Sequence, residues 1–335
     1  MPKRVDYIDV IKGIAIFGVV WRHTACPNWL TLNFIFFILG GFFFKRKPFK
    51  TFLYEKIRYI LIPFASFYSI SYLFRIGIYY WNHGSMDSFH WGCLLNVFNI
   101  SAQTDYLFVN IPLWFLLCFF TIQILYYFIS YLDKRIIFVI AILSLCFKEL
   151  LLSIPTPFMM NAAIHYLGFF ALGNLVGKPW IEKLKDVNCR KVSLFISPIL
   201  FTGLFIPIAN LDGWIYNVAY ILKLMMAFFI IMSVASCFNE KRYLSLPKFY
   251  GENSLTILGL HALPLDFLKW QTIEYFGEST PFIGFVQSII VMLVMYFVIL
   301  LCNRYIPFFV GKKNVPINEP IVSSEPVLTQ QSRFS

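Results

Sequence analysis

Ten apolar blocks dominate this sequence of 335 residues and limit the folds that it can adopt. A straight helix needs roughly 20 apolar residues to cross a bilayer, and most of the blocks approach that length. The chain is 59% hydrophobic and only 13% charged, whereas soluble domains are about one quarter charged. We therefore expect an all-α fold, a polytopic transmembrane helical bundle with about ten spans. The blocks are Tyr7–Trp21, Leu30–Phe44, Tyr59–Trp81, Pro112–Leu132, Ile136–Ser153, Asn161–Gly177, Val192–Ala209, Trp214–Phe238, Asn253–Trp270 and Pro281–Cys302.

The first block has one feature of a signal peptide, because two basic residues precede its apolar run. It also carries Asp9, Lys12 and His23, and it lacks the small-residue cleavage site that a signal peptide needs. We expect it to be a helix of the mature protein.

Basic residues gather on one side of the expected membrane. With a cytosolic N-terminus, 22 of the 28 Lys and Arg residues fall on the cytosolic side, and only Arg22, Lys148 and Lys269 fall outside. Because positive residues accumulate in cytosolic loops, we expect a multi-pass protein with both termini in the cytosol. The net charge of +11 then reflects orientation in the lipid bilayer, and no nucleic-acid partner is expected.

Composition also sets the expected domain boundary. Residues 1–310 contain the ten expected helices, whereas residues 311–335 are rich in Pro, Ser, Glu and Gln and are expected to form a disordered cytosolic tail. The seven cysteines lack the spacing of a metal site, so no metal is expected. Cys26 and Cys93 lie near the expected outer face and are a candidate disulfide pair.

Three ionisable residues share one face of the first predicted helix. At 100° per residue, Asp9, Lys12 and His23 lie within about 60° of one another, and Lys12 and His23 are about 16 Å apart along the axis. Charged groups inside a span are costly and usually mark function, so this stripe is a candidate channel between the two faces. The alternative is an interfacial Asp9–Lys12 pair with His23 in water at the helix end.

Further motifs follow this stripe in chain order. They are Asp9-Val-Ile-Lys12-Gly13 with His23 eleven residues after Lys12, Phe36-Phe37-Ile-Leu-Gly40-Gly41-Phe42, Lys56 and Arg58 before Ile62-Pro63, Pro112-Leu113-Trp114-Phe115-Leu116, and Gly251-Glu252-Asn253-Ser254-Leu255 followed by His261. In this order the chain resembles acyltransferase family 3, and within it the branch similar to fucose 4-O-acetylases. These are integral-membrane O-acyltransferases of bacterial sugars, so the resemblance implies a protein of the bacterial inner membrane.

The resemblance also implies roles for individual residues. Acetyl-CoA would be the acyl donor, and the acceptor would be a polysaccharide or a lipid-linked glycan. Acyl transfer needs a base for the hydroxyl proton, and His23 fits that role, with Asp9 and Lys12 completing the catalytic set. Asp9 is too distant to orient the imidazole of His23, so the orienting partner must come from another helix.

The remaining roles concern the two substrates. Lys56 and Arg58 are expected to hold the phosphates of CoA, although orientation in the membrane explains these charges equally well. Trp114 and His261 are candidate acceptor-side residues, and His261 has a structural role as its alternative. Three departures from the family pattern stand out. Lys replaces Arg at position 12, the second histidine before Phe36 is missing, and an Arg-x-x-Arg before the third helix is absent.

The loop between Trp81 and Pro112 is the expected acceptor entrance. It has no Lys or Arg, and its Trp, His and Asp residues suit a saccharide, although an aromatic belt at the membrane interface is an alternative reading. His165 is expected to be a packed helix residue. A secondary transporter or glycan flippase is the alternative function, because it too uses intramembrane Asp, Lys and His, but the inverted repeat that it predicts is not visible.

Overall fold

The computed structural model describes residues 6–24, 32–89, 91, 109–147, 156, 159–184, 186–208, 210–211, 213–237, 245–276 and 280–312. Every regular element in these ranges is helical. The elements are α1 (Asp6–Arg22), α2 (Phe34–Phe42), α3 (Phe49–Lys56), the π-helical turn η1 (Ile57–Leu61), α4 (Ile62–His83), the short turn η4 (Ile111–Leu113), α5 (Trp114–Ile129), α6 (Lys134–Cys146), α8 (Met160–Lys183), α9 (Val187–Leu204), α10 (Gly213–Cys237), α11 (Ser245–Glu252), α12 (Ser254–Leu260), α13 (Ala262–Phe276), α14 (Pro281–Tyr305) and the short turn η7 (Pro307–Val310).

Each apolar block of the sequence overlaps one of these helices, and the first block is helix α1. Within the described residues, four helical segments are long and apolar enough to cross a membrane: Phe49–His83, Ile111–Ile129, Gly213–Ser236 and Pro281–Tyr305. The all-α membrane protein is therefore confirmed, but the count of about ten spans is not. Helix α2, for example, has nine residues, fewer than half of the roughly 20 that a straight span needs.

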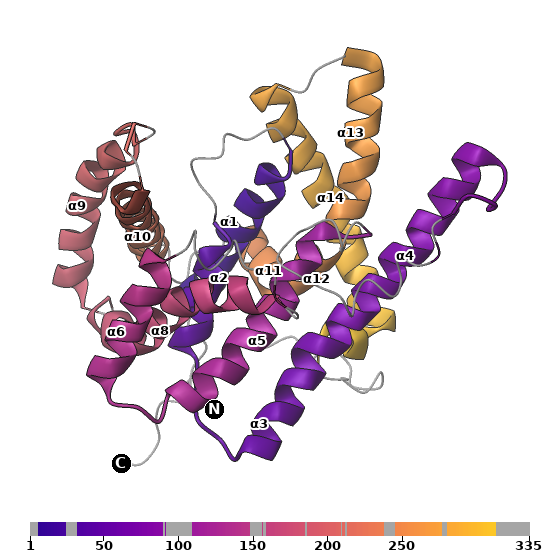
Figure 1. Ribbon diagram of the computed structural model, residues 1–335. Coiled ribbons are helices and arrows are strands. Elements are labelled where there is room, and N and C mark those ends of the chain that lie inside the picture. The colour runs from indigo at the N-terminus through magenta and orange to yellow at the C-terminus, as the bar shows by residue number, and fades with distance from the viewer. Residues whose placement is uncertain are drawn as a thin grey trace, which may run out of the picture.

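Helix α1 runs through the middle of the molecule, with α6, α9 and α10 on one side and α4, α13 and α14 on the other (Figure 1). It packs most extensively against α11, a helix that the hydropathy pattern did not predict. The backbones of the two helices touch at two glycines. A methyl group at Gly13 would overlap the carbonyl oxygen of Pro247, and one at Gly251 would overlap that of Asp9. The first residue of the motif Gly251-Glu252-Asn253-Ser254-Leu255 therefore serves the packing of α11 against α1.

A second glycine contact joins α2 to α8. A methyl group at Gly41 would overlap the carbonyl oxygen of Phe170, and one at Gly173 would overlap that of Ile38. Small residues let membrane helices approach closely. The side chain of Asn174 adds a hydrogen bond of 3.0 Å to the carbonyl oxygen of Gly41.

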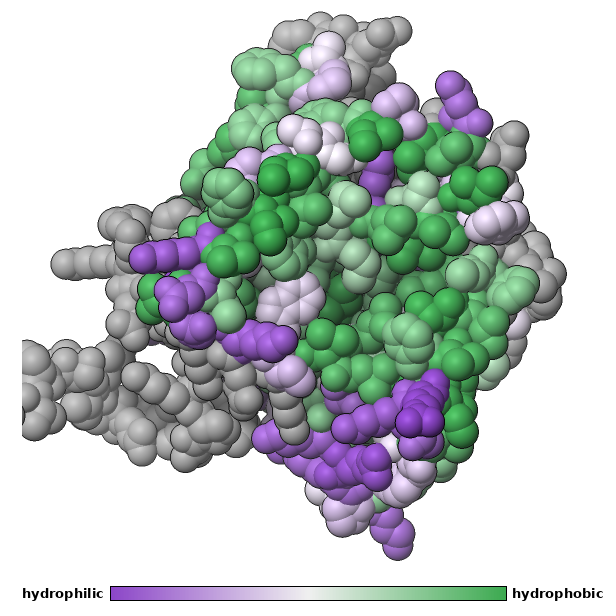
Figure 2. Space-filling view, turned by 90° about the vertical axis from the view of Figure 1, so that its left-hand side faces the viewer, coloured by the Kyte–Doolittle hydropathy of each residue, from purple (hydrophilic) through white to green (hydrophobic). Residues whose placement is uncertain are grey.

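The outer surface is largely apolar. Figure 2 shows a broad hydrophobic area, with hydrophilic side chains gathered at its lower end and along one edge. Large side chains such as Phe195 and Phe297 are 78% and 65% exposed. Such a surface fits contact with lipid, since soluble proteins rarely expose apolar patches of this extent.

Two basic residues inside helices, Arg75 in α4 and Lys223 in α10, both have polar partners. Arg75 forms an ion pair of 2.7 Å with Asp266 and thereby joins α4 to α13. Lys223 in α10 donates to the carbonyl oxygen of Leu204 at 2.8 Å, where α9 ends. Charges within an apolar layer are usually paired in this way. Arg75 and Lys223 therefore have structural roles in helix packing, whereas Lys12 belongs to the site described below.

Some sequence predictions fall outside the described residues. They include the candidate disulfide between Cys26 and Cys93 and most of the loop before Pro112, with His90 among its residues. Of the expected tail, Gly311 and Lys312 are described, and both are packed. Lys312 reaches the side-chain oxygen of Asn253, and Gly311 adopts a positive φ of 77°.

Candidate active site

Helix α1 keeps Asp9, Lys12 and His23 on one continuous helical path. The amide of His23 donates to the carbonyl oxygen of Val19 at 3.3 Å, so the helical course extends to the histidine. The carboxylate of Asp9 lies 3.2 Å from Nζ of Lys12, and Asp9 is buried. Asp9 is therefore packed within the molecule, whereas the side chain of Lys12 is partly exposed.

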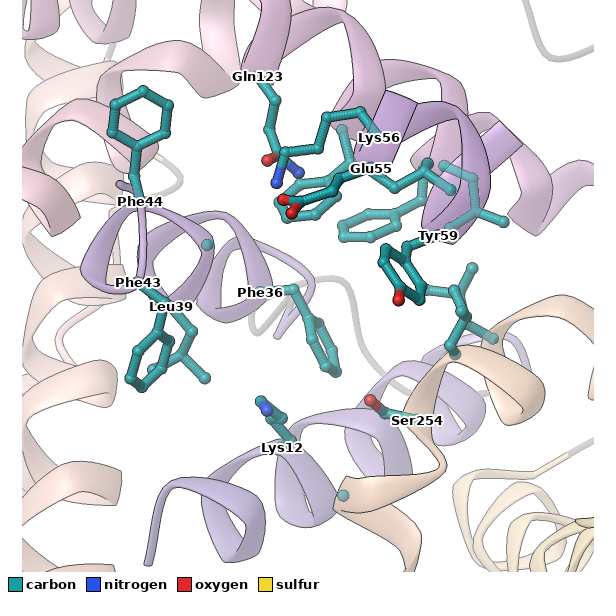
Figure 3. Close-up of a pocket in the computed structure, with 18 of the residues that line it drawn as sticks. Lys12, Phe36, Leu39, Phe43, Phe44, Glu55, Lys56, Tyr59, Gln123 and Ser254 are labelled. Carbon is teal, nitrogen blue, oxygen red and sulfur yellow. The ribbon is translucent and has the colours of Figure 1, made fainter. Parts of the chain in front are cut away.

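A cavity of about 510 Å³ opens beside the N-terminal half of α1. Lys12 points into it from α1, while Lys56 and Gln123 extend from the opposite side (Figure 3). Phe36 and Tyr59 lie between them. Among the lining residues the charged ones are four lysines and three carboxylates, so the lining has a net charge of +1: Asp9, Lys12, Lys45, Lys47, Glu55, Lys56 and Glu252.

Two of the lysines that line the cavity form ion pairs with carboxylates. Lys12 pairs with Asp9 at 3.2 Å, and Lys47 pairs with Glu55 at 2.6 Å. Nζ of Lys56 instead lies 5.0 Å from the centre of the Phe52 ring, at a distance suited to a cation–π contact. The cavity thus combines positive charge with aromatic walls.

The π-helical turn Ile57–Leu61 contributes to the wall of the cavity. Such turns are rare inside α-helices and occur often at functional sites. Lys56 and Tyr59, on either side of its first residues, both line the cavity.

Arg58 lies elsewhere. Its guanidinium carbon is 5.5 Å from the centre of the Phe308 ring in η7 and 5.5 Å from the Tyr59 ring, and Arg58 is not among the residues lining the cavity. The structure therefore separates Lys56 from Arg58, which the sequence analysis had treated as a pair.

Helix α12 connects the cavity to the far end of α1. Ser254 and Leu258 line the cavity, and His261 follows Leu258 by one helical turn. The imidazoles of His23 and His261 lie with their centroids 5.2 Å apart and their planes tilted by 48°. The structure thus brings together the predicted base and one of the two candidate acceptor-side residues.

Trp114 lies apart from this arrangement. Its ring packs 5.7 Å from that of Tyr166, and Tyr166 lines a separate cavity of about 140 Å³ that Arg22 also borders. His165 is buried, and its Nδ1 lies 3.2 Å from the carbonyl oxygen of Ser144, as befits a packed helix residue. Neither Trp114 nor His165 lines the larger cavity.

Several residues of the cavity were not predicted from the sequence, among them Tyr59 and Gln123. Tyr59 follows Lys56 by three residues and could have been placed beside it on a helix face. Gln123 is a polar residue in the middle of an apolar span, and that alone is a signal of a role inside the bundle.

Comparison with known proteins identifies the family of the chain. A family described as "Acyltransferase domain", acyltransferase family 3, matches residues 5–304, which is most of the chain. The match does not distinguish the fucose 4-O-acetylase-like branch from others. No curated protein and no solved structure matches the chain.

Proposed function

The chain belongs to acyltransferase family 3, and we propose that it is an O-acetyltransferase of the bacterial inner membrane. It transfers the acetyl group of cytosolic acetyl-CoA to a hydroxyl of a polysaccharide or lipid-linked glycan. The observation that carries this proposal is the cavity beside Lys12 and Lys56, from which α12 leads to His261 and His23.

The cavity suits the donor. CoA carries several negative phosphates at one end and a long uncharged arm at the other. Lys12, Lys45 and Lys56 supply positive charge for the phosphates, and the aromatic side chains offer surfaces for the adenine ring. Because Lys12 lies about 16 Å below His23 along the helix, the arm would carry the thioester along α1 toward the imidazole.

The chemistry assigned to His23 is general base catalysis. The acceptor hydroxyl gives its proton to the imidazole of His23 while its oxygen attacks the carbonyl carbon of the thioester. A carbon–oxygen bond forms, the carbon–sulfur bond breaks, and the departing thiolate of CoA takes the proton from the imidazolium. The products are an O-acetyl ester and free CoA, and His23 returns to its initial state.

The acceptor is assigned to the opposite end of the stripe, near the loop that begins at Trp81. Trp81, in the last turn of α4, and Trp91, in the described part of the segment that follows, are 89% and 56% exposed. Exposed aromatic rings of this kind stack on sugar faces. Trp114, at the start of α5, is also assigned to the acceptor side.

The test is a transfer assay on membranes that contain the protein. With acetyl-CoA labelled in its acetyl group, wild-type membranes should release CoA and label a glycan, and the label should be released by mild base as expected of an ester. Membranes with His23→Ala should do neither. Release of CoA without any labelled product, at the same rate in both, would contradict the proposal. No described residue and no comparison favours a transporter or flippase.

A further inference from the structure

His261 is fully buried, and the protein backbone determines which of its nitrogens carries the proton. Its Nδ1 lies 2.8 Å from the carbonyl oxygen of Ile257 and 3.1 Å from that of Leu258. Carbonyl oxygens only accept hydrogen bonds, so Nδ1 must be the protonated nitrogen of the ring. In the neutral ring Nε2 is then an acceptor.

Among the described residues this acceptor has no partner. Nε2 of His261 is buried and has no hydrogen bond to any described residue. Leaving a buried acceptor unsatisfied is costly, and a catalytic role is one of the recognised explanations of such groups in native proteins. The missing partner must be an N–H or O–H donor that can reach this nitrogen.

His23 is a donor within reach. The ring centroids are 5.2 Å apart. A ring nitrogen lies about 1.2 Å from its ring centre and a hydrogen bond spans about 2.9 Å, so two imidazoles joined edge to edge have nearly this separation. His23 is at the end of α1 and only partly buried, so its ring has room to turn.

We propose that an N–H of His23 donates a hydrogen bond to Nε2 of His261, and that His261 thereby orients His23. The catalytic meaning of this contact rests on the proposed function. His261 is then a positioning residue, and it is the orienting partner from another helix that Asp9 is too distant to be.

The hydrogen bond determines which nitrogen of His23 accepts and releases the proton. With one ring nitrogen committed to His261, the other nitrogen carries the lone pair that takes the hydroxyl proton. The resulting imidazolium keeps its hydrogen bond to His261, and charge-assisted bonds of this kind are stronger than neutral ones. The proton then leaves from the nitrogen that received it, so His261 gains and loses no proton.

Substitution separates positioning from acceptor binding. The amide oxygen of glutamine reaches the place of Nε2 and accepts a hydrogen bond, whereas leucine fills the space without an acceptor. We expect His261→Leu to lower kcat about a hundredfold with little change in the KM for acetyl-CoA, and His261→Gln to restore most of that loss. His165→Leu and His165→Gln are matched controls, because His165 is also buried and bonded to a backbone carbonyl.

The kinetic constants of the two His261 variants decide between positioning and acceptor binding. Equal losses in His261→Leu and His261→Gln, or a loss confined to the KM for the glycan acceptor, would overturn the positioning role. Folding is checked by the yield of detergent-solubilised protein that elutes as a single species. The yields of the His261 variants are compared with those of the His165 variants.

A second measurement does not depend on activity. The chain has five histidines, so nitrogen-15 labelling of histidine gives a spectrum that single substitutions can assign. In the full-length protein in nanodiscs, His23→Ala should move the resonance of the unprotonated nitrogen of His261 toward that of a nitrogen without a hydrogen bond. Thr24→Ala should leave it in place.

An unchanged His261 resonance in His23→Ala would refute the hydrogen bond, even if the wild-type protein transfers acetyl groups. Conversely, a shifted resonance in a protein that does not transfer acetyl groups would contradict the proposed function alone.

Discussion

The α carbon of Gly251 in α11 lies against the carbonyl oxygen of Asp9 in α1, with no space for a methyl group between them. Gly251→Ala should therefore push α11 away from α1. Overpacking of this kind costs typically about 1–3 kcal/mol. We expect a lower temperature of unfolding in detergent and a loss of activity, since Asp9 and its partner Lys12 border the cavity.

Gly77→Ala is the matched control for that substitution. Gly77 also lies inside a helix, but a methyl group there would have no atom within 4 Å. Alanine favours a helix over glycine by roughly 0.5–1 kcal/mol, so this variant should be as stable as wild type or slightly more stable. Equal stability of both variants would contradict the close contact of α1 and α11.

His23→Ala should abolish acyl transfer while membrane insertion and expression stay at wild-type levels. A general base contributes about 10²- to 10⁴-fold, so the remaining rate should be at least a hundredfold lower. Thr24→Ala serves as the control, because it alters the same helix end but keeps the imidazole. Wild-type activity of His23→Ala would exclude His23 as the base.

Lys56→Gln and Arg58→Gln should differ, although the two residues are neighbours in the sequence. Lys56 lines the cavity, whereas Arg58 lies against Phe308. We expect Lys56→Gln to raise the KM for acetyl-CoA far more than that for the acceptor, and added salt to weaken donor binding in the wild type. Arg58→Gln should leave the KM for acetyl-CoA nearly unchanged.

The charge on both residues also contributes to membrane orientation, so topology must be checked in each variant by the labelling of single cysteines from either face. A rise in the KM for acetyl-CoA with Arg58→Gln in correctly oriented protein would place the phosphates near η7 instead.

Lys223→Leu tests whether this intramembrane charge is structural. Its ammonium group satisfies the carbonyl oxygens of Leu204 and Ile206, where α9 ends. Loss of a hydrogen bond from a charged donor costs about 1.5–3 kcal/mol. The variant should unfold at a lower temperature and keep the KM values of both substrates. A changed KM with unchanged stability would assign Lys223 to the substrate path.

The helices and the polar stripe of α1 could be predicted from the sequence because hydropathy and helical periodicity are local properties. Helix α11 was missed because it is short and polar at several positions, and its place is set by the glycine contact with α1. The count of about ten spans is not confirmed by the described residues, in part because α2 is shorter than the apolar block that contains it.

The candidate site was predictable only in pieces. His23 and His261 were both identified, but their contact joins two distant parts of the chain, and no spacing rule predicts such a contact. Lys56 and Arg58 are two residues apart, and residues at that spacing do not share a face of a helix, so the sequence pattern itself indicates that the two side chains diverge.

Sealed membrane vesicles of known orientation test the proposed transfer across the membrane most directly. The stripe from Lys12 to His23 spans about 16 Å, which suits donor and acceptor arriving from opposite faces. When labelled acetyl-CoA contacts only the cytosolic face, we expect a labelled glycan on the other face, and no label with His23→Ala. Acetyl-CoA on the outer face should give no label. Labelling only when donor and glycan share one face would contradict transfer across the membrane.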